Sequence, residues 1–401
     1  MKVGIIREGK NPPDKRVPLS PEQCNIVMEK WPHVEIIVQP SPIRDIEDQE
    51  YLDAGVNMQE DLSDCDILMG VKEVPYDDLI PNKKYFFFSH TYKEQPYNAK
   101  LLQTILEKKI QLIDYELLKK KSGARLLGFG RYAGIVGMYN ALYAWGKKFN
   151  SFDLKRAIDC KDRKEAEAEL KKVVLPSNFK AVLTGKGRVG KGAREIIELL
   201  NIKEVGVEDF LNENNSEACW CQIDVEDYNK HPELVFDRQH FFANEEAYES
   251  NFYRFAQKAD MYVACHYWAN NAPQILTKEQ IARSDFNLKI IGDISCDIGE
   301  PIASTLRPST IAEPLYGINK NSLTEVDFHI EDSLGIMAVD NLPCELSRDA
   351  SIDFGENLIS NIFPHLFGDD PDLVIERASE TNLQGELMPA FKYLKDYVEG
   401  A

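Results

Sequence analysis

A glycine-rich run constrains the fold of this chain more than any other feature of its sequence. Residues 185–193 read GKGRVGKGA, follow the short apolar stretch 179–184 and lead into a helical pattern over 192–200. Glycines between a strand and a helix allow a tight turn and let the backbone approach a pyrophosphate, whose charge lies at the helix N-terminus. We therefore predict a dinucleotide-binding βα unit whose cofactor contacts come from this loop, namely Gly185, Gly187, Arg188, Val189 and Gly190.

The same unit should carry, about 20 residues further on, an acidic residue that holds the adenosine ribose. Glu208 and Asp209 end the next short apolar stretch, and the spacing favours Asp209, although both also fit a pair of surface acids. Lys186, Arg188 and Lys191 place positive charge in the loop, which would also accommodate a 2′-phosphate. The sequence therefore leaves the choice between NAD and NADP open.

The first third of the chain alternates short apolar runs with helical patterns. Strands are predicted at 3–7, 34–39, 66–71, 85–89 and 110–115, with helices at 21–30 and 98–108. Ser20 followed by Pro21 is a typical helix start, because serine caps the helix and proline suits its first turn. This order of elements predicts a parallel sheet with helices on its faces.

A second alternating segment contains the glycine-rich run. Helices are predicted at 132–149 and 161–172, and strands at 179–184, 261–265 and 289–294. A helix at 351–367 comes too late to belong to the nucleotide-binding sheet, so the chain is expected to return to the first lobe. A length of 401 residues suits two or three domains. We predict an α/β protein of two Rossmann-like lobes with parallel sheets and an active-site cleft between them, with residues 1–131 plus 345–401 as a substrate domain and 132–344 as the dinucleotide-binding domain.

Charge and hydropathy narrow the range of partners. Acids outnumber bases 66 to 47, which gives a net charge of −19 and repels nucleic acid and anionic membranes. No stretch approaches the roughly 20 apolar residues of a membrane helix, and the start lacks the form of a signal peptide, so a cytoplasmic protein is expected.

The eight cysteines are scattered, which suits reduced thiols. The close spacing of Cys219 and Cys221 is unlike that of a zinc site, so no metal is expected.

Three segments of the first lobe carry side chains suited to catalysis. They are KRVPLSP at 15–21, GVKEVP at 70–75 and FSHT at 88–91, each after a predicted strand, where open α/β sheets place their ligand-binding residues. Lys72 and His90 could work as an acid–base pair, provided that burial or neighbouring charge lowers the lysine pKa. Taken singly, Lys72 also fits a surface lysine and His90 a structural loop histidine.

These segments resemble a known enzyme family. The chain is similar to the saccharopine dehydrogenase (lysine-forming) and lysine–ketoglutarate reductase family, which is related to alanine dehydrogenase and to the nucleotide-binding subunit of transhydrogenase. The resemblance runs through essentially the whole chain, in segments such as DKRVPLSP, QEDLSDCDILMGVKEVP, FFFSHTYKEQ, GARLLGFGRYAGIVG, DISCDIGEPI and VDNLPCELSRDAS.

Carried over position by position, the resemblance implies roles for particular side chains. The catalytic lysine and histidine correspond to Lys72 and His90, and the acids thought to tune them to Glu73 and Glu116. The arginines that hold substrate carboxylates correspond to Arg16 and Arg125, although Arg125 also fits a structural ion pair. Two arginines favour a dicarboxylate oxo acid over a monocarboxylate such as pyruvate.

Two further aspartates concern the cofactor. Asp340 of VDNLP matches a family aspartate near the nicotinamide. Asp293 and Asp297 of GDISCD follow a predicted strand, so either fits an approach to the cofactor or a cap on the following turn.

The resemblance implies hydride transfer between NAD or NADP and the imine of L-lysine with 2-oxoglutarate, which gives saccharopine. The alternatives are an alanine dehydrogenase-like amino-acid dehydrogenase and a non-catalytic NAD(P)-binding protein of the transhydrogenase group. The expected partners are these small molecules, with neither nucleic acid nor membrane, and the chain is expected to be a monomer or homodimer. Saccharopine carries three carboxylates, so its site should be a positive island in an acidic protein.

Overall fold

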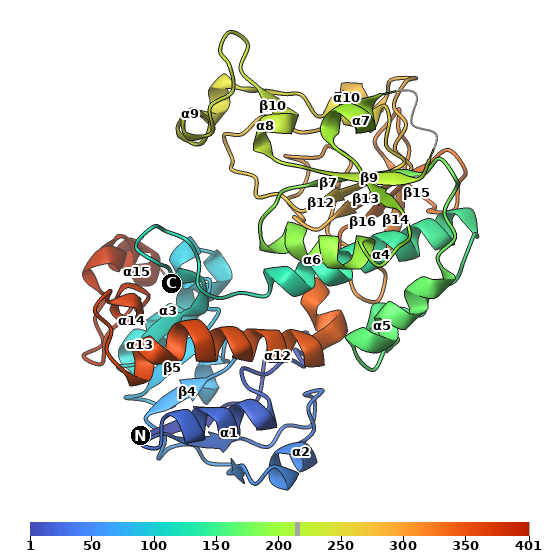
Figure 1. Ribbon diagram of the computed structural model, residues 1–401. Helices are drawn as coiled ribbons and strands as arrows, with labels where there is room; N and C mark the ends of the chain where they lie inside the picture. Colours follow the sequence, from blue (N-terminus) through green and yellow to red (C-terminus); the bar gives the residue numbers. More distant parts are fainter. Residues whose placement is uncertain (213–216, 401) are drawn as a thin grey trace. The chain divides into compact units, whose positions relative to one another are not determined.

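The computed structural model describes residues 1–212 and 217–400 and forms two compact units. The first unit combines both ends of the chain, Met1–Phe129 with Ser347–Ala401, and the second is Gly130–Leu346 (Figure 1). Each unit is built around its own β-sheet with helices against it. The predicted α/β class is confirmed.

The sheet of the first unit is parallel throughout and has the strand order β3-β2-β1-β4-β5-β6. Its strands are β1 (Lys2–Ile5), β2 (Glu35–Val38), β3 (Asn57–Met58), β4 (Ile67–Met69), β5 (Lys84–Phe87) and β6 (Gln111–Asp114). All five strands predicted here are present. The sixth, β3, has only two residues and therefore no periodicity that a sequence pattern could reveal.

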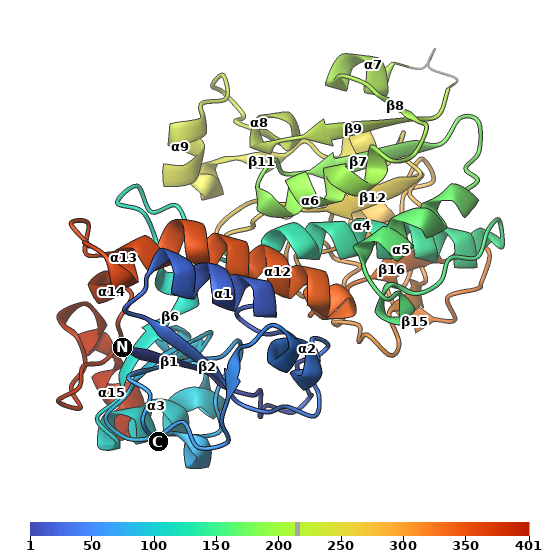
Figure 2. The same cartoon turned by 60° about the horizontal axis from the view of Figure 1, so that its bottom comes forward.

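Two helices from opposite ends of the chain pack together on this sheet. α1 (Pro21–Lys30) begins at the predicted cap, where Ser20 and Gln23 form a reciprocal capping box. α12 (Ser347–Asn357) lies beside α1 (Figure 2), and Gln23 Nε2 donates to the carbonyl of Ile352 at 2.7 Å. The C-terminal segment is thereby part of the first unit's core.

The helix predicted at 351–367 is interrupted. α12 passes into a π-helical turn (Leu358–Ile362) and then α13 (Phe363–Phe367). Pro364 lacks the N–H that a continuous α-helix needs, and a wider turn before it accommodates the missing bond. The remaining helices of this unit are α2 (Asp48–Asp53), α3 (Ala99–Glu107), α14 (Val374–Arg377) and α15 (Lys395–Glu399).

The sheet of the second unit has the order β15-β14-β16-β13-β12-β7-β9-β8 and is mixed rather than all-parallel. Its strands are β7 (Lys180–Thr184), β8 (Lys203–Glu204), β9 (Cys219–Ile223), β12 (Met261–Ala264), β13 (Ile290–Asp293), β14 (Leu315–Ile318), β15 (Glu325–Val326) and β16 (Leu334–Met337). β14 runs antiparallel to both β15 and β16, because a hairpin closes this edge. The expectation of a wholly parallel second sheet is corrected at that edge.

Close contact between α4 (Gly130–Phe149) and α6 (Arg188–Ile197) fixes the glycine-rich loop against the second unit's core. A Cβ atom at Gly134 would lie 1.9 Å from the carbonyl oxygen of Val189, and one at Gly192 would lie 1.9 Å from that of Arg131. Both glycines are therefore required for the helices to approach this closely.

The second unit also contains short elements beyond those predicted. They are α5 (Arg163–Glu169), α7 (Val207–Leu211), α8 (Val225–Tyr228), α9 (Arg238–Ala243), α10 (Tyr253–Ala256), α11 (Lys278–Ile281) and a small hairpin of β10 (Asn229–Lys230) with β11 (Glu249–Ser250). Of these, α5 lies within the predicted charged helix at 161–172. Among residues 1–212 and 217–400, no helix is both long and apolar enough to span a membrane.

Candidate active site

The imidazole of His90 lies between two carboxylates of the first unit. His90 follows β5 and adopts a left-handed backbone conformation, with φ of 56°. Its Nδ1 is 2.9 Å from Glu73 Oε1, and its Nε2 is 3.9 Å from Glu116 Oε2. Glu73 follows β4 and Glu116 follows β6, so three neighbouring strand ends assemble the group. Sequence reasoning named all three residues, and the structure brings them together.

Both carboxylates are ionised and tied to further cations. Burial alone would raise the pKa of Glu73, but hydrogen bonds from His90 and from Lys10, at 2.6 Å, bring it to about 2. Burial likewise opposes ionisation of Glu116, and Lys93 at 2.9 Å and Arg125 at 2.5 Å lower its pKa to about 2. Charge-assisted contacts of this kind hold a carboxylate in one orientation.

Lys72 precedes Glu73 and has the perturbed amine that acid–base catalysis requires. Burial, followed by the charge of Arg16, lowers its pKa, while Glu73 and Asp14 act in the opposite sense. Within the part of the chain that the structure describes, its ammonium group has no hydrogen-bond or ion-pair partner. Its backbone N–H, by contrast, is held at 2.9 Å by Glu8. The side chain is thus positioned by its backbone and left able to exchange a proton.

The two predicted carboxylate-binding arginines have different surroundings. Arg16 is 3% exposed, forms a two-point ion pair with Asp14 at 3.0 and 2.6 Å, and stacks on the ring of Phe129 at 4.2 Å. Arg125 is half-exposed and pairs with Glu116. A substrate carboxylate would therefore share each arginine with an acid of the protein.

The cluster as a whole has an excess of positive charge. Its cations are Lys10, Arg16, Lys72, Lys93 and Arg125, against three acids whose pKa lies at about 2, namely Asp14, Glu73 and Glu116. Burial raises the pKa of a fourth acid, Glu8, to about 8, so it is mostly neutral at pH 7. The carboxylate of Asp114, which accepts the backbone N–H of His90, is a further acid of the cluster. With Lys72 protonated and Asp114 charged, the cluster carries one positive charge more than negative ones in a chain of net charge −19.

Sequence reasoning missed several partners in this cluster. Asp14 lies two residues before Arg16, a spacing that suits a local ion pair. Glu8 follows β1 and Asp114 ends β6, so the rule that ligand residues follow strands would have indicated both. Lys10 and Lys93 give no comparable signal, because isolated lysines are common on protein surfaces.

The glycine-rich loop has the geometry of a pyrophosphate cradle. Gly185 follows β7 with φ of +85°, and α6 begins at Arg188, one turn before the predicted pattern, with Gly187 as its N-cap. A Cβ atom at Gly190 would lie 2.0 Å from the carbonyl oxygen of Gly185, whereas one at Gly187 would meet nothing within 4 Å. The loop is therefore tight at Gly190 and open at Gly187, in front of the helix N-terminus. These residues fit a dinucleotide.

A cavity of about 740 Å³ adjoins this loop. It lies where β7, β8 and β9 end, and Lys186, Lys191 and Arg194 contribute to its wall. Arg194 is paired with Glu204 through its two terminal nitrogens, Nη1 and Nη2, at 2.7 and 2.5 Å. Lys186 and Lys191 have no ion-pair partner within 1–212 and 217–400. The cavity therefore presents two available cations beside the cradle.

The predicted ribose acid does not line this cavity. Asp209 is exposed on α7, and the strand next to β7 is β9 rather than β8. The spacing of about 20 residues leads to α7, which follows β8, whereas the strand beside β7 ends at Ile223 and is followed by Asp224. Asp224 itself caps α8 and binds Arg238 at 2.7 Å.

The other two cofactor candidates lie near strand ends of the same sheet. Asp293 ends β13, is fully buried, and accepts hydrogen bonds from Ser295, Cys296 and Thr305. It therefore caps the turn, which was one of its two expected roles. Asp340 is exposed shortly after β16.

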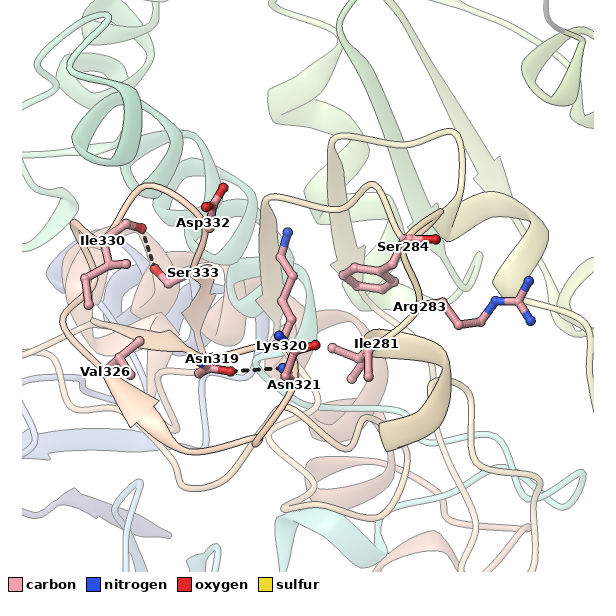
Figure 3. Close-up of a pocket in the computed structure, with 12 residues that line it drawn as sticks. Ile281, Arg283, Ser284, Asn319, Lys320, Asn321, Val326, Ile330, Asp332 and Ser333 are labelled. Atoms are coloured by element: carbon pink, nitrogen blue, oxygen red, sulfur yellow. Dashed lines mark hydrogen bonds between the residues drawn. The ribbon is translucent and has the colours of Figure 1, made fainter.

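A second cavity of about 470 Å³ lies at the opposite end of this sheet (Figure 3). It adjoins Phe286 before β13 and Ser333 before β16, and Lys320 extends into it. None of the predicted site residues lines it, so it is separate from the nucleotide-binding features.

Comparisons with known proteins confirm the resemblance stated from the motifs. Residues 4–136 match the family described as alanine dehydrogenase/PNT, N-terminal domain. The chain is 31% identical over 400 residues to alpha-aminoadipic semialdehyde synthase of Arabidopsis thaliana, covering 89% of this chain and 37% of that protein. It is 24% identical over 355 residues to saccharopine dehydrogenase (NAD(+), L-lysine-forming) of Neurospora crassa, covering 81% of each chain.

The chain thus spans well under half the length of the curated alpha-aminoadipic semialdehyde synthases that it matches, between 37% and 44% of each. Among solved structures, an L-alanine dehydrogenase aligns with a TM-score of 0.64 at 16% identity over 99% of this chain and 100% of that one. A transhydrogenase from Sinorhizobium meliloti aligns with a TM-score of 0.56 at 13% identity, over 98% and 100%. At these identities the likeness establishes a shared fold.

Proposed function

We propose that this chain is an NAD(P)-dependent oxidoreductase that joins L-lysine and 2-oxoglutarate into saccharopine, in a reversible reaction. The observation that carries the proposal is the imidazole of His90, which faces Glu116 and is held by Glu73. Glu73 is next in sequence to Lys72, whose amine has a lowered pKa. The similarity to proteins named alpha-aminoadipic semialdehyde synthase and saccharopine dehydrogenase supports the choice of substrates. The acid–base groups belong to the first unit and the glycine loop to the second, so the reaction needs both.

The charge of the first unit's cluster supports an acidic substrate. A surplus of positive charge suits a molecule with several carboxylates, because each carboxylate that leaves water needs a cation or a set of N–H donors. Arg125 is the half-exposed member and is the candidate for an incoming carboxylate, while Arg16 is already held by Asp14.

The chain's own residues would handle the protons of this reaction. Lys72, as the neutral amine, takes a proton from the ε-ammonium of lysine, whose nitrogen then bonds to the oxo carbon of 2-oxoglutarate. One proton of that nitrogen passes to the oxygen and gives a hydroxyl. His90 gives a further proton to this hydroxyl, which leaves as water and yields the protonated imine. A bound reduced nicotinamide would supply the hydride that adds to the imine carbon and gives the secondary amine. Such proton transfers typically contribute about 10²–10⁴ to a rate.

NADP is the favoured cofactor. The cavity beside the glycine loop offers Lys186 and Lys191, and two of its three acids, Glu204 and Glu226, are bound to arginines. The third acid, Asp227, accepts the backbone N–H of Asp224 at 2.9 Å. An ionised acid free to bind the ribose hydroxyls would reject a 2′-phosphate, whereas unpaired lysines attract it.

The test is to follow oxidation of NADPH and NADH by absorbance with lysine and 2-oxoglutarate together, and with each alone. We expect turnover only with both, and saccharopine as the product by mass spectrometry. A Lys72→Met variant should lose turnover and still bind the nucleotide. Turnover with pyruvate and ammonia instead would favour an alanine dehydrogenase-like activity, and binding without any turnover would favour a non-catalytic protein.

A further inference from the structure

The C-terminal segment reaches the loop of His90 through an added strand contact. Residue Ser379 pairs with Ile113 in an antiparallel bridge beside β6. The N–H of Glu380 donates to the carbonyl of Leu112 at 2.8 Å, and the N–H of Asp114 donates to the carbonyl of Ala378 at 3.1 Å. This pairing carries the side chain of Glu380 to the ends of β5 and β6, where it is fully buried.

Glu380 enters a compact network of oxygen atoms under His90. Its Oε1 is 3.0 Å from Ser89 Oγ, and its Oε2 is 2.8 Å from Thr91 Oγ1. Ser89 Oγ is also 2.7 Å from Thr91 Oγ1 and 2.6 Å from Asp114 Oδ2. Asp114 Oδ2 in turn accepts the backbone N–H of His90 at 3.1 Å. A chain of contacts thus connects Glu380 to the backbone of the catalytic histidine.

A count of protons decides the charge state of this network. Its four oxygen–oxygen contacts have only two hydroxyl protons between them, one on Ser89 and one on Thr91. Burial raises the pKa of Asp114 as well. Asp114, however, accepts three backbone N–H groups, from Ser89, His90 and Glu116, and these contacts favour its charged form. A third proton is therefore best placed on Glu380, which then donates to Ser89 and accepts from Thr91, while Ser89 donates to Asp114. Three of the four contacts then have a proton, and the approach of Ser89 to Thr91 has none.

The surroundings of Glu380 agree with a neutral acid. Burial, and next the charge of Asp114, raises its pKa to about 8. The other titratable groups that face it are the phenols of Tyr393 and Tyr397, whose own pKa values are raised by burial and by Glu380. The side chains that bear directly on its charge are therefore acids or neutral hydroxyls.

We propose that Glu380 is a positioning residue of the site: as a neutral acid, it orients Ser89 toward Asp114, and Asp114 holds the backbone of His90 in the conformation that directs its imidazole to Glu73. This inference rests on the proposed function for its kinetic consequences only. Ionisation of Glu380 removes the proton donated to Ser89 and places a second negative charge beside Asp114. The loop of His90 then loses its fixed orientation as the pH rises through about 8.

Three variants separate this role from ordinary packing. Glu380→Gln keeps a donor and an acceptor in the same shape and cannot ionise, whereas Glu380→Ala removes both. Ser379→Ala is the matched control, because Ser379 lies in the same segment and hydrogen-bonds Gln111 and Ile375, outside the network. We expect Glu380→Ala to lower kcat by roughly tenfold to a hundredfold, the usual cost of a misplaced catalytic group, and Glu380→Gln and Ser379→Ala to keep it.

The pH profile is the decisive kinetic readout. In the unaltered protein and in Ser379→Ala, kcat should fall as the pH rises through about 8, and Glu380→Gln should lack this fall. An equal loss of kcat in Glu380→Gln and Glu380→Ala would overturn the proposal. So would a Glu380→Gln profile that still falls at the same pH.

A readout without substrate keeps the proposal independent of the proposed reaction. The folded pKa of Glu380 is raised above its unfolded value of 4.5, so the unaltered protein should lose stability as the pH rises from about 4.5 to about 8. In thermal unfolding, the melting temperature of Glu380→Gln should rise relative to that of the unaltered protein as the pH increases across this window. A constant difference would show that Glu380 is not the proton carrier, even if lysine and 2-oxoglutarate prove not to be the substrates.

Discussion

His90 Nδ1 lies 2.9 Å from Glu73 Oε1, and this contact decides which nitrogen of the imidazole takes part in proton transfer. Glu73 has a pKa of about 2, so at neutral pH its carboxylate can accept a hydrogen bond but cannot donate one. Nδ1 must carry the shared proton, which leaves Nε2 as the nitrogen that gains and loses a proton. Nε2 is 3.9 Å from the nearest oxygen of Glu116, too long for a hydrogen bond, so it is open to a substrate.

Glu73→Gln is the first prediction, because an amide can donate to Nδ1 and so stabilise the wrong tautomer. We expect kcat to fall about 10²–10⁴-fold, close to the effect of His90→Gln, with the fold retained. Steady-state kinetics measure kcat, and circular dichroism measures whether the fold is retained. Glu60→Gln is the control, since Glu60 is exposed and pairs with Arg7 on the surface. Full activity in Glu73→Gln would show that the contact does not set the tautomer.

Arg125→Ala tests whether the half-exposed arginine binds the oxo acid. Loss of a charged hydrogen-bonding partner should raise KM for 2-oxoglutarate roughly tenfold or more, with little change in KM for lysine. Because Arg125 is half-exposed, its pair with Glu116 should add only about 0–1 kcal/mol to the free energy of unfolding. Arg125→Lys should recover part of the affinity. An unchanged KM would return Arg125 to a structural role.

The strands that the sequence predicts well in the first unit each have three buried residues in a row. β1, β2, β4, β5 and β6 all match predicted strands, because each is buried and bounded by turns. β3 and β8 have two residues each, and β9, with the sequence CWCQI, contains two cysteines that are easily taken for a metal motif. Because the sequence pattern does not predict β9, it also does not identify the acid that follows the strand beside β7.

Site residues that follow strands could be predicted, and those that come from remote segments could not. Lys72 and His90 each follow a predicted strand, so one rule finds both, and the family resemblance named Glu73 and Glu116. Ser89 and Glu380 are 291 positions apart and lie in contact only because the C-terminal segment pairs with β6. A periodicity or a spacing rule describes neighbours along the chain and contains no information about such a contact.

Cofactor choice is predicted to depend on Lys186 and Lys191. Replacing both with alanine should raise KM for NADPH roughly tenfold or more and leave KM for NADH nearly unchanged, because only NADPH presents a phosphate to them. Lys164→Ala is the control, since Lys164 is an exposed lysine of α5 in the same unit. Equal effects on the two nucleotides would mean that the lysines bind the pyrophosphate or only attract anions generally.

Asp14→Asn should destabilise the first unit in a pH-dependent way. Asp14 is buried, and despite that burial Arg16 lowers its pKa from 3.8 to about 2. Its contribution is therefore complete above about pH 4 and lost as the pH falls toward 2. At neutral pH the variant's free energy of unfolding should be lower by about 3–5 kcal/mol, the cost of breaking a buried pair. The difference between the variant and the unaltered protein should become smaller in acid. Asp64→Asn, at the exposed pair with Lys2, should change stability little at any pH, and urea unfolding at several pH values measures both.

Two glycines of the nucleotide loop should respond differently to the same substitution. Gly187→Val places its side chain in open space before the N-terminus of α6, at a φ of −74° that any residue adopts, so the melting temperature should change little. The added methyl groups would nevertheless occupy the volume that a pyrophosphate needs, and affinity for NAD(P)H should fall at least tenfold. Gly190→Val cannot be accommodated in this way, because its Cβ would lie 2.0 Å from the carbonyl oxygen of Gly185, and the unit should be strongly destabilised. Calorimetry of unfolding and nucleotide titration separate the two cases, and unchanged nucleotide affinity in a folded Gly187→Val protein would place the cofactor elsewhere.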